Sequence, residues 1–64
     1  MIVNGKEIKI SEGTTLKDFL ISSQYDISRI AVELNGKISP RRTFDEIILK
    51  DTDSMEIVNF VGGG

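Results

Sequence analysis

The chain has 64 residues, of which 39% are hydrophobic, and a formal net charge of −2, which limits it to one small domain with a single core. It contains no cysteine and no histidine, which excludes disulfides, thiolate nucleophiles and imidazole bases. Its charges are scattered, without a basic cluster for nucleic acid or an apolar stretch long enough to cross a membrane. The first residues do not resemble a signal peptide, so we expect a cytoplasmic protein with no nucleic-acid or membrane partner.

The first ten residues predict a β-hairpin. A short apolar stretch at residues 2–3 is followed by Asn4-Gly5, the dipeptide favoured in two-residue turns because both positions need positive φ. Residues 6–10 then alternate between polar and apolar side chains, as a half-buried strand does. We therefore expect two antiparallel strands joined by a tight turn.

An amphipathic helix is predicted next, ending near Ser23. Thr15 is suited to cap its N-terminus, because a threonine oxygen can accept a hydrogen bond from a free backbone N–H of the first turn. Leu16, Phe19 and Leu20 then form an apolar stripe with helical spacing and are expected in the core. A helix this short is marginal alone and must be held by packing on a sheet.

A second hairpin is predicted over residues 29–39, with its turn at Asn35-Gly36. Pro40 has no backbone N–H to donate, so the return strand should end before it. Residues 43–46 match a capping box, with threonine first and glutamate fourth. We therefore expect a single helical turn that begins at Thr43.

The C-terminal part predicts a turn at residues 51–54 and a last strand over residues 55–61. Asp51 and Asp53 are spaced as a metal-binding pair would be, but no further ligands lie nearby. Formation of the turn explains them better, because aspartate side chains readily accept hydrogen bonds from nearby backbone N–H groups.

These elements predict a β-grasp, the ubiquitin-like α+β architecture. A single helix between two hairpins should cover one face of one sheet. The last strand then needs a partner, and the first strand, lying parallel to it at the sheet centre, is the natural one. We expect a mixed five-stranded sheet in a domain of residues 1–61, followed by a flexible glycine tail at residues 62–64.

Alternation along the last strand separates two sets of side chains. Met55 and Ile57 are expected to face the helix-covered core, which places Val58 and Phe60 on the open face of the sheet. An apolar pair beside the tail would suit the docking of a partner protein. The alternative is that other side chains of the same chain cover Val58 and Phe60.

The chain ends in three glycines, Gly62, Gly63 and Gly64, directly after the last strand. Lacking Cβ atoms, they can enter a narrow channel and present only the terminal carboxylate. That carboxylate needs activation, for example as an acyl adenylate, before a sulfur donor converts it to a thiocarboxylate or a lysine amine to an isopeptide. The glycines do not decide between these products, and a leftover linker or a frayed terminus is the simpler alternative.

Four segments of the sequence resemble the thiamine-biosynthesis sulfur carrier family, ThiS: residues 2–6, 15–20, 32–36 and 51–64. The order of these segments and the length of the chain are also similar to those of that family. The resemblance implies a β-grasp fold and a protein that is a co-substrate of enzymes and not itself an enzyme. The terminal Gly-Gly pair of the family corresponds to Gly63 and Gly64, and Gly62 extends it. Thr52 stands where the family often has glycine, a difference that affects the turn only.

The resemblance also implies a reaction cycle and its partners. An adenylating enzyme of the ThiF type would use MgATP to make an acyl adenylate at Gly64. Sulfur drawn from cysteine through a desulfurase would convert it to a thiocarboxylate, and a thiazole synthase of the ThiG type would take up that sulfur. No cofactor or metal would be bound permanently.

Three other functions fit a β-grasp domain with a glycine tail. One is a sulfur carrier for molybdopterin synthesis, the small subunit of molybdopterin synthase. That family is usually longer and often has a proline in the approach to its tail. Residues 59–61 contain no proline, which favours the thiamine carrier. The others are a ubiquitin-like modifier joined to lysines through Gly64 and a binding module with an idle tail.

Overall fold

Five strands, one α-helix and two 3₁₀ turns are present in residues 1–60, the part of the chain that the computed structural model describes. In chain order they are β1 (Ile2–Val3), β2 (Lys6–Glu7), α1 (Leu16–Ser22), the turn η1 (Ile27–Arg29), β3 (Ile30–Leu34), β4 (Lys37–Ile38), the turn η2 (Arg41–Thr43) and β5 (Ser54–Asn59). The predicted glycine tail at residues 62–64 lies outside the described residues.

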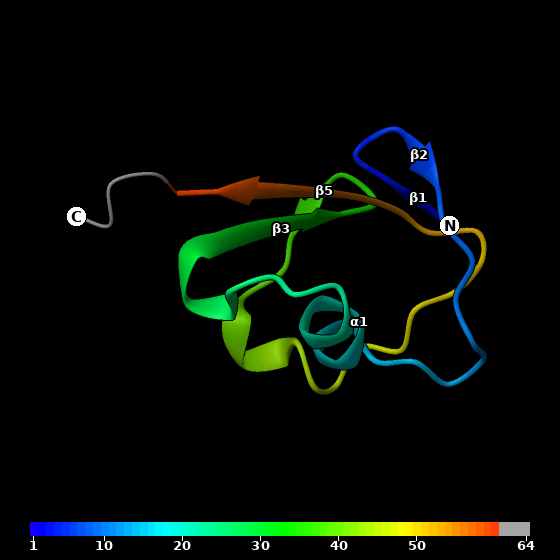
Figure 1. The fold of residues 1–64 in the computed structure, drawn as a ribbon, viewed down its shortest axis with the longest axis horizontal. Coiled ribbons are helices and arrows are strands. Elements are labelled where there is room, and N and C mark those ends of the chain that lie inside the picture. The colour runs from blue at the N-terminus through cyan, green and yellow to red at the C-terminus, as the bar shows by residue number, and fades with distance from the viewer. Residues whose placement is uncertain (61–64) are drawn as a thin grey trace.

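The five strands form one mixed sheet in the order β2-β1-β5-β3-β4. β1 and β5 run parallel at the centre, with Val3 opposite Met55, and the other neighbouring strands are antiparallel. α1 lies on one side of this sheet, together with the loops that follow β4, and no helix covers the other side in residues 1–60 (Figure 1). The predicted β-grasp arrangement of sheet and helix is confirmed.

Both Asn-Gly turns have the backbone that the sequence predicts. Asn4 and Gly5 have φ angles of 50° and 84°, and Asn35 and Gly36 have 52° and 83°. Two consecutive residues with positive φ give the turn a twist that matches the twist of the flanking strands. Each hairpin is therefore specified locally by its own dipeptide.

The second strand is shorter than the sequence predicts. β2 ends at Glu7, whereas alternation predicts a strand over residues 6–10. Its partner β1 is only two residues long, and the last contact is the bond from Ile8 N to Met1 O, at 2.7 Å. Beyond that point the chain has no strand to pair with, although Ile8 and Ile10 still pack against the core.

Helix α1 is capped and packed as the sequence predicts. The side chain of Thr15 accepts a hydrogen bond from Asp18 N at 3.1 Å, and Ser23 caps the other end. Its apolar stripe is buried, with Leu16 and Leu20 fully covered.

No helix in residues 1–60 is long and apolar enough to cross a membrane.

A single core fills the space between the helix and the sheet. Its buried members are Met1, Val3, Leu16, Phe19, Leu20, Ile30, Val32, Phe44, Leu49, Met55 and Ile57. Alternate residues of β3 and β5 contribute to it, which leaves the residues between them on the open face. The sheet therefore has one buried face and one exposed face, as the period-two patterns predict.

A turn does begin at Thr43, where Glu46 N donates to Thr43 O at 2.9 Å, but the predicted capping box does not form. The 3₁₀ turn η2 comes just before it, beginning directly after Pro40 and ending at Thr43. Proline fixes a φ suited to a helix start, and Pro40 O accepts hydrogen bonds from both the backbone N and the side chain of Thr43. The Thr43 hydroxyl thus binds backward to Pro40 and is not available to cap the backbone N–H of Glu46.

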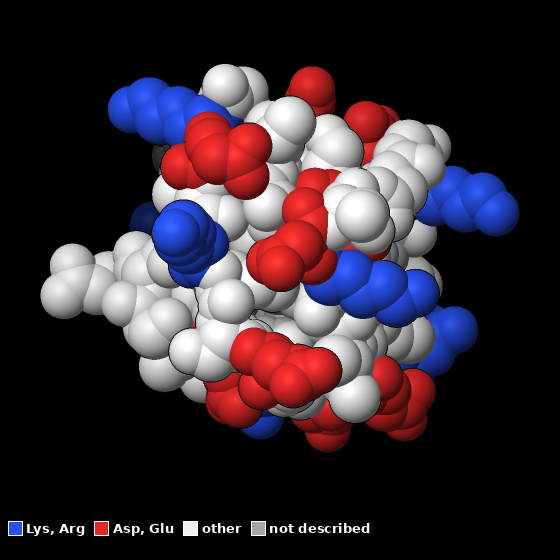
Figure 2. All heavy atoms as spheres, turned by 90° about the vertical axis from the view of Figure 1, so that its right-hand side faces the viewer, with Lys and Arg blue, Asp and Glu red and all other residues white. Residues whose placement is uncertain are grey.

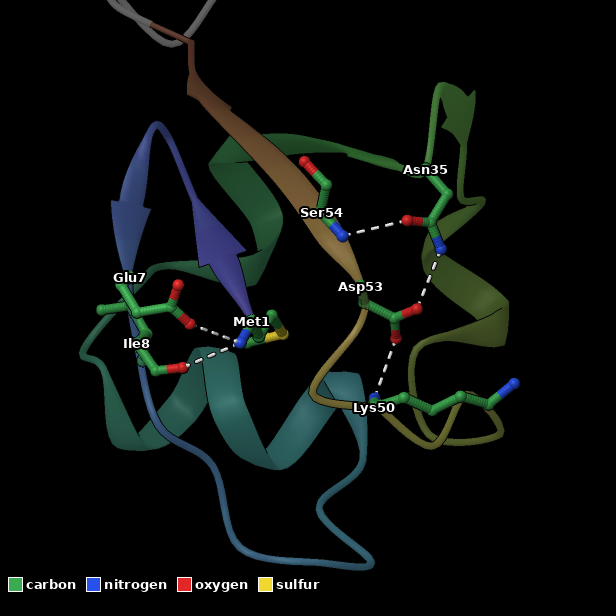
Figure 3. A network of polar contacts seen from close by, with 7 residues as sticks. All are labelled: Met1, Glu7, Ile8, Asn35, Lys50, Asp53 and Ser54. Carbon is green, nitrogen blue, oxygen red and sulfur yellow. Dashed lines mark hydrogen bonds and ion pairs between the residues drawn. The ribbon is translucent and has the colours of Figure 1, made fainter.

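A polar network fixes the start of β5 (Figure 3). Asp53 is 9% exposed, and its carboxylate accepts hydrogen bonds from Asn35 Nδ2 and Lys50 N, both at 2.9 Å. Asn35 Oδ1 in turn accepts a bond from Ser54 N. The turn role predicted for Asp53 is therefore confirmed, and the network joins the β3–β4 turn to the strand that leads to the C-terminus.

The N-terminus is also held by polar contacts at the edge of the sheet (Figure 3). The Met1 ammonium donates to Glu7 Oε2 at 3.0 Å and to Ile8 O at 3.2 Å, while the Met1 side chain is buried. This role of Met1 is not predictable from the sequence pattern, because a terminal residue carries no periodic signal.

Candidate functional site

β5 is the strand that leads toward the predicted sulfur-carrying terminus, and its last exposed side chains form the described part of the site. Val58 and Phe60 are 57% and 53% exposed, whereas Met55 and Ile57 are almost fully buried. Val58 and Phe60 therefore lie on the open face of the sheet and are not covered by other side chains of residues 1–60. The predicted site residues Gly62, Gly63 and Gly64 lie outside the described residues.

Pairing with β3 holds the end of β5 in place. Val58 lies opposite Ala31 in the antiparallel ladder. Phe60 N donates to Arg29 O at 2.7 Å, so pairing continues one residue past the end of the strand. The backbone that carries Phe60 is thus fixed to the sheet up to the last described residue.

The side chain of Asn4 holds β5 from the other side. Asn4 Oδ1 accepts a hydrogen bond from Ile57 N at 2.8 Å, and Asn4 Nδ2 donates to Ile57 O at 3.3 Å. β1 ends at Val3, and these two bonds continue the contact with β5 where the β1 backbone turns away. The sequence predicts Asn4 as a turn residue, but this second role depends on the register of the sheet.

Acidic residues share the open face with Val58 and Phe60. Glu33 lies directly opposite Glu56 in the β3–β5 ladder, and both are exposed. Ile38, which is 67% exposed, lies opposite Glu33 on β4. Their juxtaposition is not predictable from the sequence, because strand patterns show which side chains share a face of one strand but not which residues are neighbours across strands.

The turn η1 lies next to Phe60 through Arg29 and is stabilised by a local cap. Asp26 accepts hydrogen bonds from the Ser28 hydroxyl at 2.6 Å and from Ser28 N at 3.0 Å. These two bonds, with a smaller contribution from nearby arginines, hold the pKa of the Asp26 carboxyl below its usual value of 3.8. The carboxylate therefore stays ionised, and continues to cap η1, throughout the neutral pH range.

The opposite end of the molecule carries mixed charge and a shallow hollow. Figure 2 shows acidic and basic side chains interspersed over this end, with acidic ones both near the middle and at the upper and lower margins. A hollow of about 550 Å³ lies between residues 10–13 and 48–51. Within residues 1–60, no three His, Cys, Asp or Glu side chains gather as a metal site requires.

The chain matches the ThiS family over residues 1–64. It is 41% identical over 63 residues to the sulfur carrier protein ThiS of Bacillus subtilis, an alignment that covers 97% of this chain and 96% of the relative. The chain belongs to the ThiS family. Membership of this family of sulfur carriers confirms the resemblance seen in the sequence.

A solved structure supports the same family and fold. The crystal structure of the thiamine biosynthesis protein ThiS from Geobacter metallireducens superposes with a TM-score of 0.82 at 33% identity, covering 98% of this chain and 96% of that one. The ThiS-type β-grasp is therefore the fold of this chain.

A second kind of relative is much longer. The whole chain is 34% identical over 64 residues to part of the thiazole synthase of Paramagnetospirillum magneticum. The chain spans about a fifth of that protein, since the matched segment makes up 20% of its length. The ThiS-like segment and the name thiazole synthase thus occur together in one polypeptide.

Proposed function

We propose that this ThiS-family protein carries sulfur for thiazole formation in thiamine biosynthesis, as a thiocarboxylate on Gly64. The observation that supports this most is the match to the ThiS family over residues 1–64, which includes the three terminal glycines. The second is the fold, in which Asn4 holds β5 as far as Ile57 and pairing beside β3 holds the chain as far as Phe60, shortly before those glycines in the sequence.

The proposed chemistry takes place at the terminal carboxylate, on partner enzymes. A carboxylate oxygen of Gly64 attacks the α-phosphorus of ATP and releases pyrophosphate, which gives an acyl adenylate. Hydrosulfide, or an equivalent sulfide-level nucleophile, then attacks the acyl carbon and releases AMP, which leaves a thiocarboxylate. The chain supplies the carboxylate and its presentation, and the catalytic groups belong to the partners, so the protein is a co-substrate and not an enzyme.

Two partners follow from this chemistry. An adenylating enzyme of the ThiF type would carry out the first step with MgATP, and a thiazole synthase of the ThiG type would accept the sulfur. A cysteine desulfurase would supply sulfur indirectly. The thiazole synthase of Paramagnetospirillum magneticum supports the second partner, because a segment of it is similar to this whole chain.

Val58 and Phe60 are proposed to dock these partners. They are the exposed apolar side chains of the described part of the chain that lie nearest the glycines in sequence. Partly exposed aromatic side chains often anchor protein interfaces, because they bury a large apolar area when they become covered. Docking at this position would hold the strand while the glycines reach into the active site of the partner.

Reconstitution with purified proteins tests the proposal. The chain is incubated with the adenylating enzyme of its own cell, MgATP and a sulfur donor, and its intact mass is then measured. We expect one oxygen to be replaced by sulfur in an ATP-dependent manner, with the change in the C-terminal peptide. A mass that stays unchanged would contradict the proposal, and an isopeptide with lysines of other proteins would support a modifier instead.

A further inference from the structure

The charged side chains that the strands place on the open face are all acidic in the described part of the chain. Glu33 and Glu56 lie on this face beside the exposed Val58. The strand lysines Lys6 and Lys37 lie opposite Val3 and Leu34, two residues of the core side, and so project toward the other face. The ladder thus separates positive from negative charge between the two faces of the sheet.

Glu33 and Glu56 repel each other across the β3–β5 ladder. Directly opposed residues of an antiparallel pair lie on the same face with Cβ atoms about 4.5–5.5 Å apart, and like charges there destabilise the sheet. In residues 1–60, the ion pairs join Met1 with Glu7 and Arg29 with Asp26. No described cation of the chain therefore lies within ion-pair distance of Glu33 or Glu56.

An exposed apolar side chain lies beside each of these two carboxylates on the open face. Ile38 lies beside Glu33 on β4, and Val58 is two residues beyond Glu56 on β5. Both are more than half exposed, at 67% and 57%. An acidic centre with apolar neighbours matches a partner surface in which one cation is surrounded by apolar side chains.

We propose that this face binds thiazole synthase through an arginine or lysine of that enzyme that lies between Glu33 and Glu56. Apolar side chains of the enzyme would then cover Ile38, Val58 and Phe60. Arginine suits the position best, because its planar guanidinium donates several hydrogen bonds to carboxylates in a fixed geometry. This inference rests on the proposed function, which names thiazole synthase as a partner.

The same charges argue against other occupants. A second copy of this chain, docked face to face, would bring two acidic pairs together and add repulsion. An anionic membrane surface or a nucleic-acid backbone would be repelled for the same reason. A positively charged protein surface is the occupant that relieves the repulsion between Glu33 and Glu56.

The test measures binding and folding stability in the same variants. The chain carrying both Glu33→Gln and Glu56→Gln is compared with the wild type for affinity to purified thiazole synthase across a series of salt concentrations. We expect the dissociation constant at low salt to rise about tenfold and its salt dependence to flatten. We also expect the melting temperature to rise by about 1–4 °C, because the repulsion is removed.

A matched control carries Glu12→Gln and Glu46→Gln, which change the net charge equally at exposed positions outside the sheet. The control should bind thiazole synthase as the wild type does. Equal affinity of the Glu33/Glu56 variant and the wild type would overturn the inference, as would a wild type that does not bind the enzyme.

The same proteins separate this inference from the proposed function. Sulfuration of the wild type at Gly64, with equal binding by the wild type and the Glu33/Glu56 variant, would overturn the inference alone. Charge-dependent binding by a chain that never gains sulfur would uphold the inference and contradict the thiocarboxylate chemistry.

Discussion

Asn4 and Ile57 are joined by two hydrogen bonds between the side-chain amide of Asn4 and both backbone polar groups of Ile57. Asn4 also has a φ of 50°, which the β1–β2 turn requires. One residue therefore forms the first turn and holds the strand that leads to the C-terminus. The amide replaces backbone pairing that β1 is too short to provide.

Replacing Asn4 with glycine separates these two roles. Glycine accepts positive φ without strain but cannot bond to Ile57, so Asn4→Gly should lower the free energy of unfolding by about 1–2 kcal/mol. Asn4→Ala should lower it further, because alanine also resists the positive φ. Urea denaturation of the three proteins checks this order, and an unchanged midpoint for Asn4→Gly would show that the two bonds contribute no net stability.

Replacing Phe60 tests the proposed docking position. Phe60 is 53% exposed on the open face, so Phe60→Glu should leave the free energy of unfolding within about 0.5 kcal/mol of the wild type. Loss of an aromatic anchor should weaken binding to the adenylating enzyme or thiazole synthase about tenfold or more.

Ile21→Glu is the control for that change, because Ile21 is 54% exposed on α1, on the other side of the sheet. Isothermal titration calorimetry compares the affinities of the two variants for each enzyme. If both enzymes bind the Phe60 and Ile21 variants equally well, the open face is not the docking surface.

The cap of η1 gives a prediction about pH. Hydrogen bonds from Ser28 keep the folded-state pKa of Asp26 below 3.8, so they favour the ionised form. A carboxyl group whose pKa is lower in the folded than in the unfolded state stabilises the fold at any pH above its unfolded-state pKa. This stabilisation is lost as the pH falls through the folded-state pKa. The pH dependence from Asp26 should therefore lie in the acid range below 3.8, with none near neutrality.

An NMR titration of the Asp26 carboxyl carbon measures this directly. The midpoint should lie below 3.8 in the wild type and should rise toward that value in Ser28→Ala, which removes the donor hydroxyl. Identical midpoints in the two proteins would mean that the hydroxyl does not influence the carboxylate.

Shortening the chain by Gly64 tests the position of the reacting carboxylate. The deletion moves that group back by roughly 3.5 Å, whereas reacting atoms must approach within about 3–3.5 Å. We expect adenylation and sulfuration to be lost, and the melting temperature to be unchanged, because glycines bury no side chain in the core. An assay of ATP-dependent activation compares the full-length and shortened chains. Full activity of the shortened chain would contradict a carrier function for Gly64.

Much of the fold follows from local rules that the sequence displays. The two Asn-Gly turns, the Thr15 cap and the Leu16/Phe19/Leu20 stripe each depend on residues within a few positions of each other. The capping box expected at residues 43–46 does not form, because the Thr43 hydroxyl donates to Pro40 O, although Glu46 N still bonds to Thr43 O. The turn η2, which starts after the fixed φ of Pro40, was not predicted.

The site was predictable in part only. Alternation along β5 places Val58 and Phe60 on the open face, and their exposure agrees with it. The opposition of Glu33 and Glu56, by contrast, depends on how β3 and β5 are aligned, and no short-range pattern specifies that register. The bonds between Asn4 and Ile57 were missed for the same reason, since 53 positions separate the two residues.

Intact-protein mass spectrometry of the chain purified from its own cells tests most directly whether Gly64 carries sulfur. The spectrum should contain, beside the unmodified chain, a species in which one oxygen is replaced by sulfur. Fragmentation should place that sulfur on Gly64, and the species should be absent from cells that lack the adenylating enzyme. A native chain that is never sulfurated, or one attached through Gly64 to lysines of other proteins, would contradict the carrier function.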